Sequence, residues 1–123
     1  MTEVMVVSDL KRSAEEQRRV KELLDHIHKN CGRISAIKDL ADNEDECKRL
    51  FRKYLNTTPM EYLRQYRMKL ACQLLTQTKN SITEISAECG MNNSYLCKRI
   101  REETGMTPLE YRRAYYRNQT EQK

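Results

Sequence analysis

A stretch of sequence occurs twice in this chain, 49 positions apart. Residues 49–62 match residues 98–111, and each copy ends in a Thr-Pro-x-Glu-Tyr sequence that begins at Thr58 or Thr107. A threonine cap, a proline at the first helical position and a glutamate three residues after the cap together form a strong helix start. Repetition of one supersecondary unit indicates one task that is carried out twice. The chain is therefore predicted to contain two related helical units.

The composition favours an all-α fold. Only two prolines and three glycines occur in 123 residues, so few residues break helices. Hydrophobic residues make up 38% of the chain and charged residues 33%, which predicts a thin core under a heavily charged surface. The formal net charge of +5 permits a nucleic-acid partner, but it is weak evidence because many soluble proteins carry a similar surplus.

Helix caps and apolar spacing predict about seven helices. A capping box at Ser13 begins the first helix, which should end near Gly32, and a second box begins at Ser81. The helices are expected at residues 14–32, 35–41, 44–55, 58–78, 82–90, 94–103 and from 107 onward. The expected organisation is a frayed N-terminus or linker remnant over 1–13, a first subdomain over 14–57, a linker helix over 58–78 and a second subdomain over 79–123.

Each repeat holds two short helices around a tight turn, followed by a capped helix. In a helix-turn-helix the second helix enters the major groove of DNA, which requires short polar side chains at its start and basic residues one turn later. Leu96 and Ile100 form the apolar back of this helix in the second repeat. The candidate DNA contacts on the opposite side are Asn93, Ser94, Cys97, Lys98 and Arg101.

The second repeat resembles a known family. Residues 82–90, 94–98 and 104–112 are similar to the signature of AraC/XylS-type transcriptional regulators, and residues 62–75 resemble the linker helix of that family. The resemblance covers residues from about 20 to 117, nearly the whole chain. It implies two homeodomain-like helix-turn-helix subdomains joined by a long linker helix. It also implies sequence-specific binding of double-stranded DNA in a bacterial transcription regulator, with two recognition helices in successive major grooves.

The family pattern also assigns DNA-reading positions in both units. In the second unit these are Asn93, Ser94, Cys97 and Lys98, and in the first they are Asn43, Asp45, Lys48 and Arg49. Arg52 is expected to help Lys48 and Arg49 to position the first unit on phosphates.

The first unit departs from this pattern in two ways. It is about three residues shorter, so its turn or its first helix must be trimmed. Four carboxylates, of Asp42, Glu44, Asp45 and Glu46, surround the start of its recognition helix. Carboxylates repel phosphates, although they can accept a hydrogen bond from cytosine. The second unit is therefore expected to supply most of the sequence discrimination.

Several alternatives remain at this point. A helical repeat with apolar faces could serve as a protein-docking module without DNA contact. An enzyme is not expected, because the sequence contains no Gly-rich phosphate loop or nucleophile motif. Arg67 is a candidate for a phosphate contact and for an ion pair inside the domain. The other candidates for phosphate contact, each of which could equally be a surface charge, are Arg64, Lys69, Lys79, Arg112, Arg113 and Arg117.

The cysteines and the N-terminus indicate a cytoplasmic protein. Five cysteines without any C-x-x-C pair are expected to be reduced thiols, with redox sensing as the alternative. Cys47, Cys72 and Cys89 should pack among apolar residues, and Cys97 should be more accessible. No metal, cofactor, signal peptide or membrane span is expected. Double-stranded DNA is the expected partner and RNA polymerase a further candidate. The sequence leaves open whether the chain is a stand-alone regulator or the C-terminal piece of a larger one.

Overall fold

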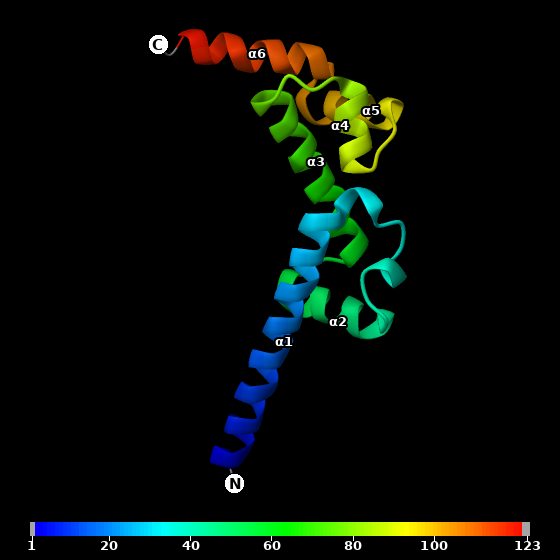
Figure 1. The fold of residues 1–123 in the computed structure, drawn as a ribbon. Helices are drawn as coiled ribbons and strands as arrows, with labels where there is room; N and C mark the ends of the chain where they lie inside the picture. Colours follow the sequence, from blue (N-terminus) through cyan, green and yellow to red (C-terminus); the bar gives the residue numbers. More distant parts are fainter. Residues whose placement is uncertain (1, 122–123) are drawn as a thin grey trace. The chain divides into compact units, whose positions relative to one another are not determined.

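The computed structural model describes residues 2–121, with side chains for residues 10–119, and it is all-helical over that range (Figure 1). This confirms the predicted fold class, with six α-helices and two 3-10 turns in place of about seven helices. In chain order the elements are α1 (Thr2–Asn30), η1 (Cys31–Arg33), η2 (Ile37–Asp39), α2 (Glu44–Leu55), α3 (Pro59–Gln77), α4 (Ile82–Cys89), α5 (Asn93–Thr104) and α6 (Pro108–Glu121).

The described chain packs as two compact units. The first holds the residues up to Asn30 together with Ile34–Leu63, and the second holds Cys31–Arg33 and the residues from Arg64 onward. The long helix α3 contributes to both units, since the division falls inside it. Among the described residues, every helix is too short or too polar to cross a lipid bilayer.

The first unit is built on the packing of α2 against α1 (Figure 1). Apolar residues recur on α1 at helical spacing, and Val20 and Ile27 are buried there. On α2, the predicted inward residues Cys47, Leu50 and Phe51 are each at most 1% exposed. Burial of these apolar side chains is the main force that holds α2 in a fixed orientation.

The predicted start of the first helix at Ser13 is wrong. Helix α1 begins at Thr2, and the Ser13 hydroxyl accepts a hydrogen bond from Gln17 Nε2 at 3.3 Å inside the helix. Residues 2–12 contain neither proline nor glycine, so nothing in their sequence stops a helix from extending through them. The lack of an apolar period over residues 1–13 therefore did not indicate a frayed segment in the part that the structure describes.

Residues 35–41, which were expected to form the first helix of the first helix-turn-helix, contain only the 3-10 turn η2. In η2 the Asp39 carboxylate accepts hydrogen bonds from the backbone N–H groups of Ser35 and Ala36, at 2.9 and 3.1 Å. These two bonds hold the pKa of Asp39 below its usual value. Because the first unit is shorter than the family pattern, either its turn or the first helix of its helix-turn-helix was expected to be trimmed. The structure shows a three-residue turn, η2, where the second unit has the eight-residue α4, so the helix is the reduced part.

The sequence repeat is also a structural repeat. Asn56 follows α2 as its C-cap, and Gly105 follows α5 as its C-cap, 49 residues later. Both residues adopt the left-handed conformation, with φ of 53° and 75°. The N–H of Asn56 donates to the carbonyl of Arg52, and the N–H of Gly105 donates to the carbonyl of Arg101. Both helices therefore end in the same way at equivalent positions, as in a common type of helix C-terminus.

The predicted helix starts are confirmed in both units. The Thr58 hydroxyl accepts from the N–H of Glu61 at 3.1 Å, and the Thr107 hydroxyl accepts from the N–H of Glu110 at 3.2 Å. Each threonine thus satisfies a backbone donor that would otherwise lack a partner in the first turn. These caps fix the residues at which α3 and α6 begin.

The second unit has its own core between α3, α4 and α5. Its buried members are Met68, Ala71, Leu75, Ile85, Cys89, Leu96 and Ile100. Two arginines fasten irregular segments to this core by hydrogen bonds to backbone carbonyls. Arg67 donates to the carbonyl of Cys31 through Nε and Nη2 at 2.9 and 2.7 Å, and Arg112 donates to the carbonyls of Leu75 and Asn80 at 2.8 and 2.7 Å. Both are therefore part of the internal structure.

The segment Cys31–Arg33 lies directly on the end of α4. A Cβ atom added to Gly32 would come within 2.5 Å of the backbone oxygen of Glu88, which no side chain could accommodate without a shift of the backbone. Glycine is needed here for close approach of two backbones. The second unit thus includes the 3-10 turn η1, which packs on the end of α4.

Candidate nucleic-acid interface

Helices α4 and α5 form the helix-turn-helix of the second unit (Figure 1). Ser81 caps α4 through a hydrogen bond from Glu84 N at 3.1 Å, as its capping box predicts. Gly90 ends α4 with φ of 74°, a conformation that glycine adopts without strain. Asn92 then caps α5 by accepting from Tyr95 N at 2.7 Å. Helix α5 therefore starts one residue earlier than predicted, at Asn93.

The predicted DNA-contacting residues of α5 share one exposed face. Helical spacing places them together, while Leu96 and Ile100, on the side that faces the core, are fully buried. This confirms the assignment of the apolar back of α5. The residues that the structure brings together on the exposed face are Asn93, Ser94, Cys97, Lys98 and Arg101.

The Asn93 side chain is oriented by a residue that sequence analysis missed. Its Nδ2 donates to the hydroxyl of Thr83 on α4 at 3.0 Å. An asparagine amide has two N–H donors and a carbonyl acceptor, so a donor and the acceptor are left for a second partner. Nothing in the spacing of Thr83 and Asn93, ten residues apart on different helices, indicated this contact.

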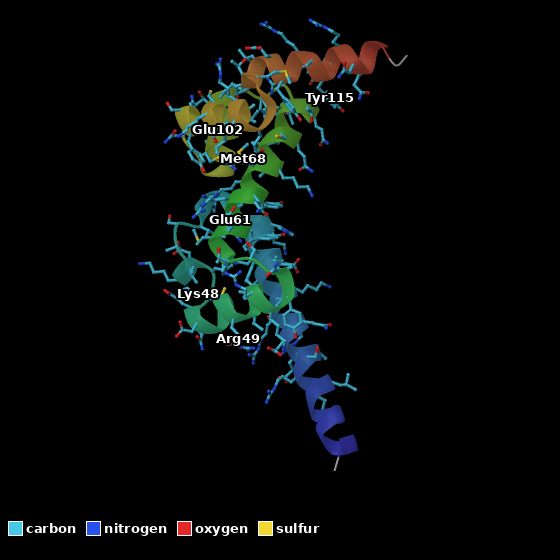
Figure 2. All side chains as sticks on the ribbon, turned by 180° about the vertical axis from the view of Figure 1, so that it is seen from behind. Lys48, Arg49, Glu61, Met68, Glu102 and Tyr115 are labelled. Carbon is cyan, nitrogen blue, oxygen red and sulfur yellow. The ribbon has the colours of Figure 1, made fainter. Side chains whose placement is uncertain are left out.

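In the first unit, α2 occupies the position of α5 in the repeat. The Asn43 side chain accepts from Glu46 N at 3.0 Å and so caps α2, as Asn92 caps α5. This uses the Asn43 acceptor inside the protein. The predicted contacts Asp45, Lys48 and Arg52 are exposed on α2, where Lys48 is labelled in Figure 2.

Arg49, also labelled in Figure 2, is engaged by a buried carboxylate. Its Nη1 lies 2.8 Å from Glu16 Oε2, and Lys53 Nζ lies 3.0 Å from Glu16 Oε1. Only 4% of Glu16 is exposed. The hydrogen bond from Lys53, and to a lesser extent that from Arg49, holds the pKa of Glu16 below its ordinary value. Glu16 falls four residues before Val20 on the buried stripe of α1, and this spacing is a signal that could have identified it.

The acidic start of α2 is partly neutralised. Glu46 forms an ion pair with Arg19 of α1. The other three carboxylates, those of Asp42, Glu44 and Asp45, belong to exposed residues. Carboxylates are favourable at a helix N-terminus because of the helix dipole, but at the groove-facing end of a recognition helix they repel phosphates.

The cysteines are distributed as the apolar pattern predicts, with one difference. Cys47 and Cys89 are buried, Cys97 is exposed on α5, and Cys72, which was expected to be buried, is half-buried. Burial raises the pKa of the Cys47 thiol to about 11 and that of Cys89 to about 12. Cys31 is buried too. In the described part of the chain, no group of three or more His, Cys, Asp or Glu side chains could hold a metal ion.

Comparison with known proteins identifies the domain type. A family model described as a helix-turn-helix domain matches residues 38–114, more than half of the chain. An uncharacterized HTH-type transcriptional regulator of Bacillus subtilis, YdeC, is 32% identical over an alignment of 100 residues. The alignment covers 77% of this chain and 34% of that protein. The chain thus spans about a third of the length of this relative.

Solved structures show the same fold. A transcriptional regulator from Chromobacterium violaceum with an AraC-type DNA-binding domain matches with a TM-score of 0.71 and 29% identity, over 83% of this chain and 96% of that one. The DNA-binding domain of AdpA matches with a TM-score of 0.71 and 23% identity, over 80% of this chain and 93% of that one. Together with the family model, these matches confirm the resemblance carried by the two repeats, and the chain belongs to the AraC-type family of helix-turn-helix DNA-binding domains of transcription regulators.

Proposed function

We propose that this chain binds double-stranded DNA sequence-specifically, with α5 as the principal reading helix and α2 as a helix that mainly positions the domain. The observation that carries the proposal is the exposed face of α5. An amide, a hydroxyl and a thiol are followed by two cations on that face, and fully buried Leu96 and Ile100 hold the helix from behind. Short polar side chains can hydrogen-bond to base edges, and the cations that follow them can contact base edges or phosphates.

Individual residues of α5 have distinct expected partners. Asn93 can pair with an adenine edge through its remaining donor and its acceptor, and Lys98 can donate to guanine O6 and N7. Ser94 can donate to or accept from a base. Arg101, two turns into the helix, suits a phosphate at the edge of the groove. We expect these contacts to give the second unit most of the sequence discrimination.

Helix α2 is less suited to reading bases. Asn43 is used as a helix cap and Arg49 is held by Glu16, which leaves Lys48 and Arg52 as the predicted cations for phosphates. Asp45 adds a negative charge near the start of the helix. The first unit is therefore assigned mainly to sequence-independent contacts, which fix register without carrying sequence information.

The solved relative AdpA supports the DNA partner, because that domain is described in complex with a target DNA. A DNA-binding regulator of this kind acts where the bacterial chromosome lies, so we assign the chain to the cytoplasm. We assign it no enzymatic activity, as expected for a DNA-binding domain of a transcription regulator.

The test is the salt dependence of binding to duplex DNA. Release of counterions from neutralised phosphates makes log affinity fall linearly with log salt, and we expect a slope of magnitude at least about 4. Arg18→Gln on α1, which removes a charge from an i, i+4 surface pair with Glu22, serves as the control and should leave the slope unchanged. A flat titration would reject DNA binding and favour a protein-docking module.

A further inference from the structure

A hollow in the second unit lies beside the first turn of α5. Its volume is about 300 Å³. The walls come from α3, from the turn of the helix-turn-helix and from α5. The lining residues are Arg64, Arg67, Gly90, Met91, Asn92 and Tyr95.

The positive charge of Arg67 is fixed at this hollow before any ligand arrives. The two hydrogen bonds from its Nε and Nη2 to the carbonyl of Cys31 hold the guanidinium group. A Cβ atom placed on Gly90 would lie 3.1 Å from Nη2, so the guanidinium lies against the backbone of the turn. A charge that is already in position costs little reorganisation when an anion binds.

The chemistry of the lining suits an anion. Arg64 lies one turn before Arg67 on the same helix and is exposed, and Tyr95 is 39% exposed with a hydroxyl that can donate. No carboxylate occurs among the described residues that line the hollow. Guanidinium groups bind phosphate oxygens with well-matched geometry.

We infer that this hollow binds one backbone phosphate of the DNA strand next to α5, with Arg64 and Tyr95 as its ligands and Arg67 as a fixed charge behind them. Tyr95 follows directly after Asn93 and Ser94, so DNA whose bases meet those two side chains presents its backbone close to Tyr95. The inference rests on the proposed function and names a contact that the repeat did not reveal. A free phosphate ester shares the same chemistry, and the experiment below separates the two sources.

The experiment removes one phosphate charge and one protein charge, singly and together. The probe is a duplex that the wild-type protein selects from a random-sequence pool, synthesised with a single neutral methylphosphonate at each backbone position in turn. The variants are Arg64→Gln and Tyr95→Phe. Arg18→Gln, an exposed arginine of α1 that does not line this hollow, is the control with the same loss of charge.

We expect Arg64→Gln to weaken binding on the order of threefold to tenfold and to lower the salt slope by about one unit. At one backbone position, the methylphosphonate should weaken DNA binding by the wild type and by Arg18→Gln. At that position it should cause no further loss of binding by Arg64→Gln. Tyr95→Phe should show a smaller loss that is focused on the same position. Arg64 is exposed and lies outside the core, so its replacement leaves the buried apolar contacts of the second unit unchanged.

Three results would overturn the inference. If the wild type selects no duplex, the proposed function fails and this contact fails with it. If the wild type binds DNA but Arg64→Gln keeps the full slope and the same sensitivity at every methylphosphonate position, only this inference fails. If calorimetry shows that inorganic phosphate alone binds the wild type and not Arg64→Gln, while both bind DNA equally, the hollow belongs to a small phosphorylated ligand.

Discussion

Arg49 and Lys98 occupy equivalent positions of the two repeats, 49 residues apart, yet only Arg49 is held by a buried carboxylate. Arg49 Nη1 lies 2.8 Å from Glu16 Oε2, whereas Lys98 belongs to the exposed face of α5. The first recognition helix therefore uses part of its positive charge to fasten itself to α1. Arg49 therefore contributes to the packing of the first unit, whereas Lys98 at the equivalent position remains exposed on α5.

The Glu16 carboxylate should make the stability of the protein depend on pH. Its pKa is lowered in the folded state, so the ionised form stabilises the fold above the ordinary value of 4.5. This stabilisation is lost as the pH falls through the folded pKa. We expect Glu16→Gln to lower the urea midpoint at pH 7 and the difference from wild type to shrink below about pH 4.5.

The control for this measurement is Glu15→Gln on the same helix. Glu15 is exposed, so its substitution removes the same charge. The contacts of Glu16 with Arg49 and Lys53 remain intact in this variant. Its urea midpoint should remain close to that of the wild type at all pH values. Equal effects of the two substitutions would mean that the contact with Arg49 and Lys53 contributes nothing specific.

Thr83 should influence base reading without touching DNA. Thr83→Val keeps the shape of the side chain and removes the acceptor that orients Asn93. We expect discrimination to fall by about 0.5–1.5 kcal/mol at the same base pair that Asn93→Ala affects, because a single hydrogen bond is lost. Binding-site selection with each variant measures this. Thr83→Ser, which retains the hydroxyl, should restore the preference, and failure of that rescue would remove Thr83 from a positioning role.

The glycines of the second unit should differ in their tolerance of a side chain. A Cβ atom on Gly105 would meet nothing within 4 Å, so Gly105→Ala should cost only the backbone strain of its positive φ, about 1 kcal/mol. Gly32→Ala would place a Cβ atom 2.5 Å from the Glu88 carbonyl oxygen and should cost about 2 kcal/mol or more. Chemical denaturation measures both, and a larger loss for Gly105→Ala would contradict the backbone contact at Gly32.

Local signals predicted much of this fold. The capping residues Thr58, Ser81 and Thr107 each bond the expected N–H, because a cap depends only on residues within one turn. The exposed face of α5 followed from helical periodicity for the same reason. Two elements differed. Helix α1 extends over a segment with no apolar period, and residues 35–41 form only a 3-10 turn.

Contacts between distant parts of the sequence could not be predicted. The partners of Arg67 and Arg112 are backbone carbonyls 32 to 37 residues away, and every residue has such a carbonyl, so no residue type marks the site. The contact of Glu16 with Arg49 joins two helices whose packing is set by the apolar core. Such contacts appear only when the tertiary arrangement is known.

The thiols should react at very different rates. Cys97 is exposed, whereas burial raises the pKa of Cys47 to about 11 and of Cys89 to about 12, which leaves almost no reactive thiolate at neutral pH. We expect iodoacetamide to modify Cys97 at least about tenfold faster than the two buried cysteines, and bound DNA to protect it. Mass spectrometry follows each site. If half-buried Cys72 reacts as fast as Cys97, the helix phasing of α5 or α3 is wrong.

The two recognition helices should respond differently to loss of charge. Lys98→Ala removes a cation from the exposed face of α5 and should relax preference at one base pair by about 1–3 kcal/mol. Arg49→Ala, its counterpart in the repeat, should leave base preference unchanged and lower the urea midpoint, because Glu16 then loses a partner. Arg52→Ala should weaken binding to all sequences about equally.

The acidic start of α2 gives the decisive comparison between the two units. Asp45 is exposed at the end of the helix that would face the groove. Its carboxylate repels phosphates and so does not favour binding to a duplex of arbitrary sequence. Asp45→Ala should therefore leave affinity unchanged or raise it, with the same selected site. A cytosine amino group is the one base group that this carboxylate can accept from, so a reading role would appear as lost preference for cytosine at one position. If Asp45→Ala abolishes such a preference while Lys98→Ala changes nothing, the first unit is the reader and the assignment is reversed.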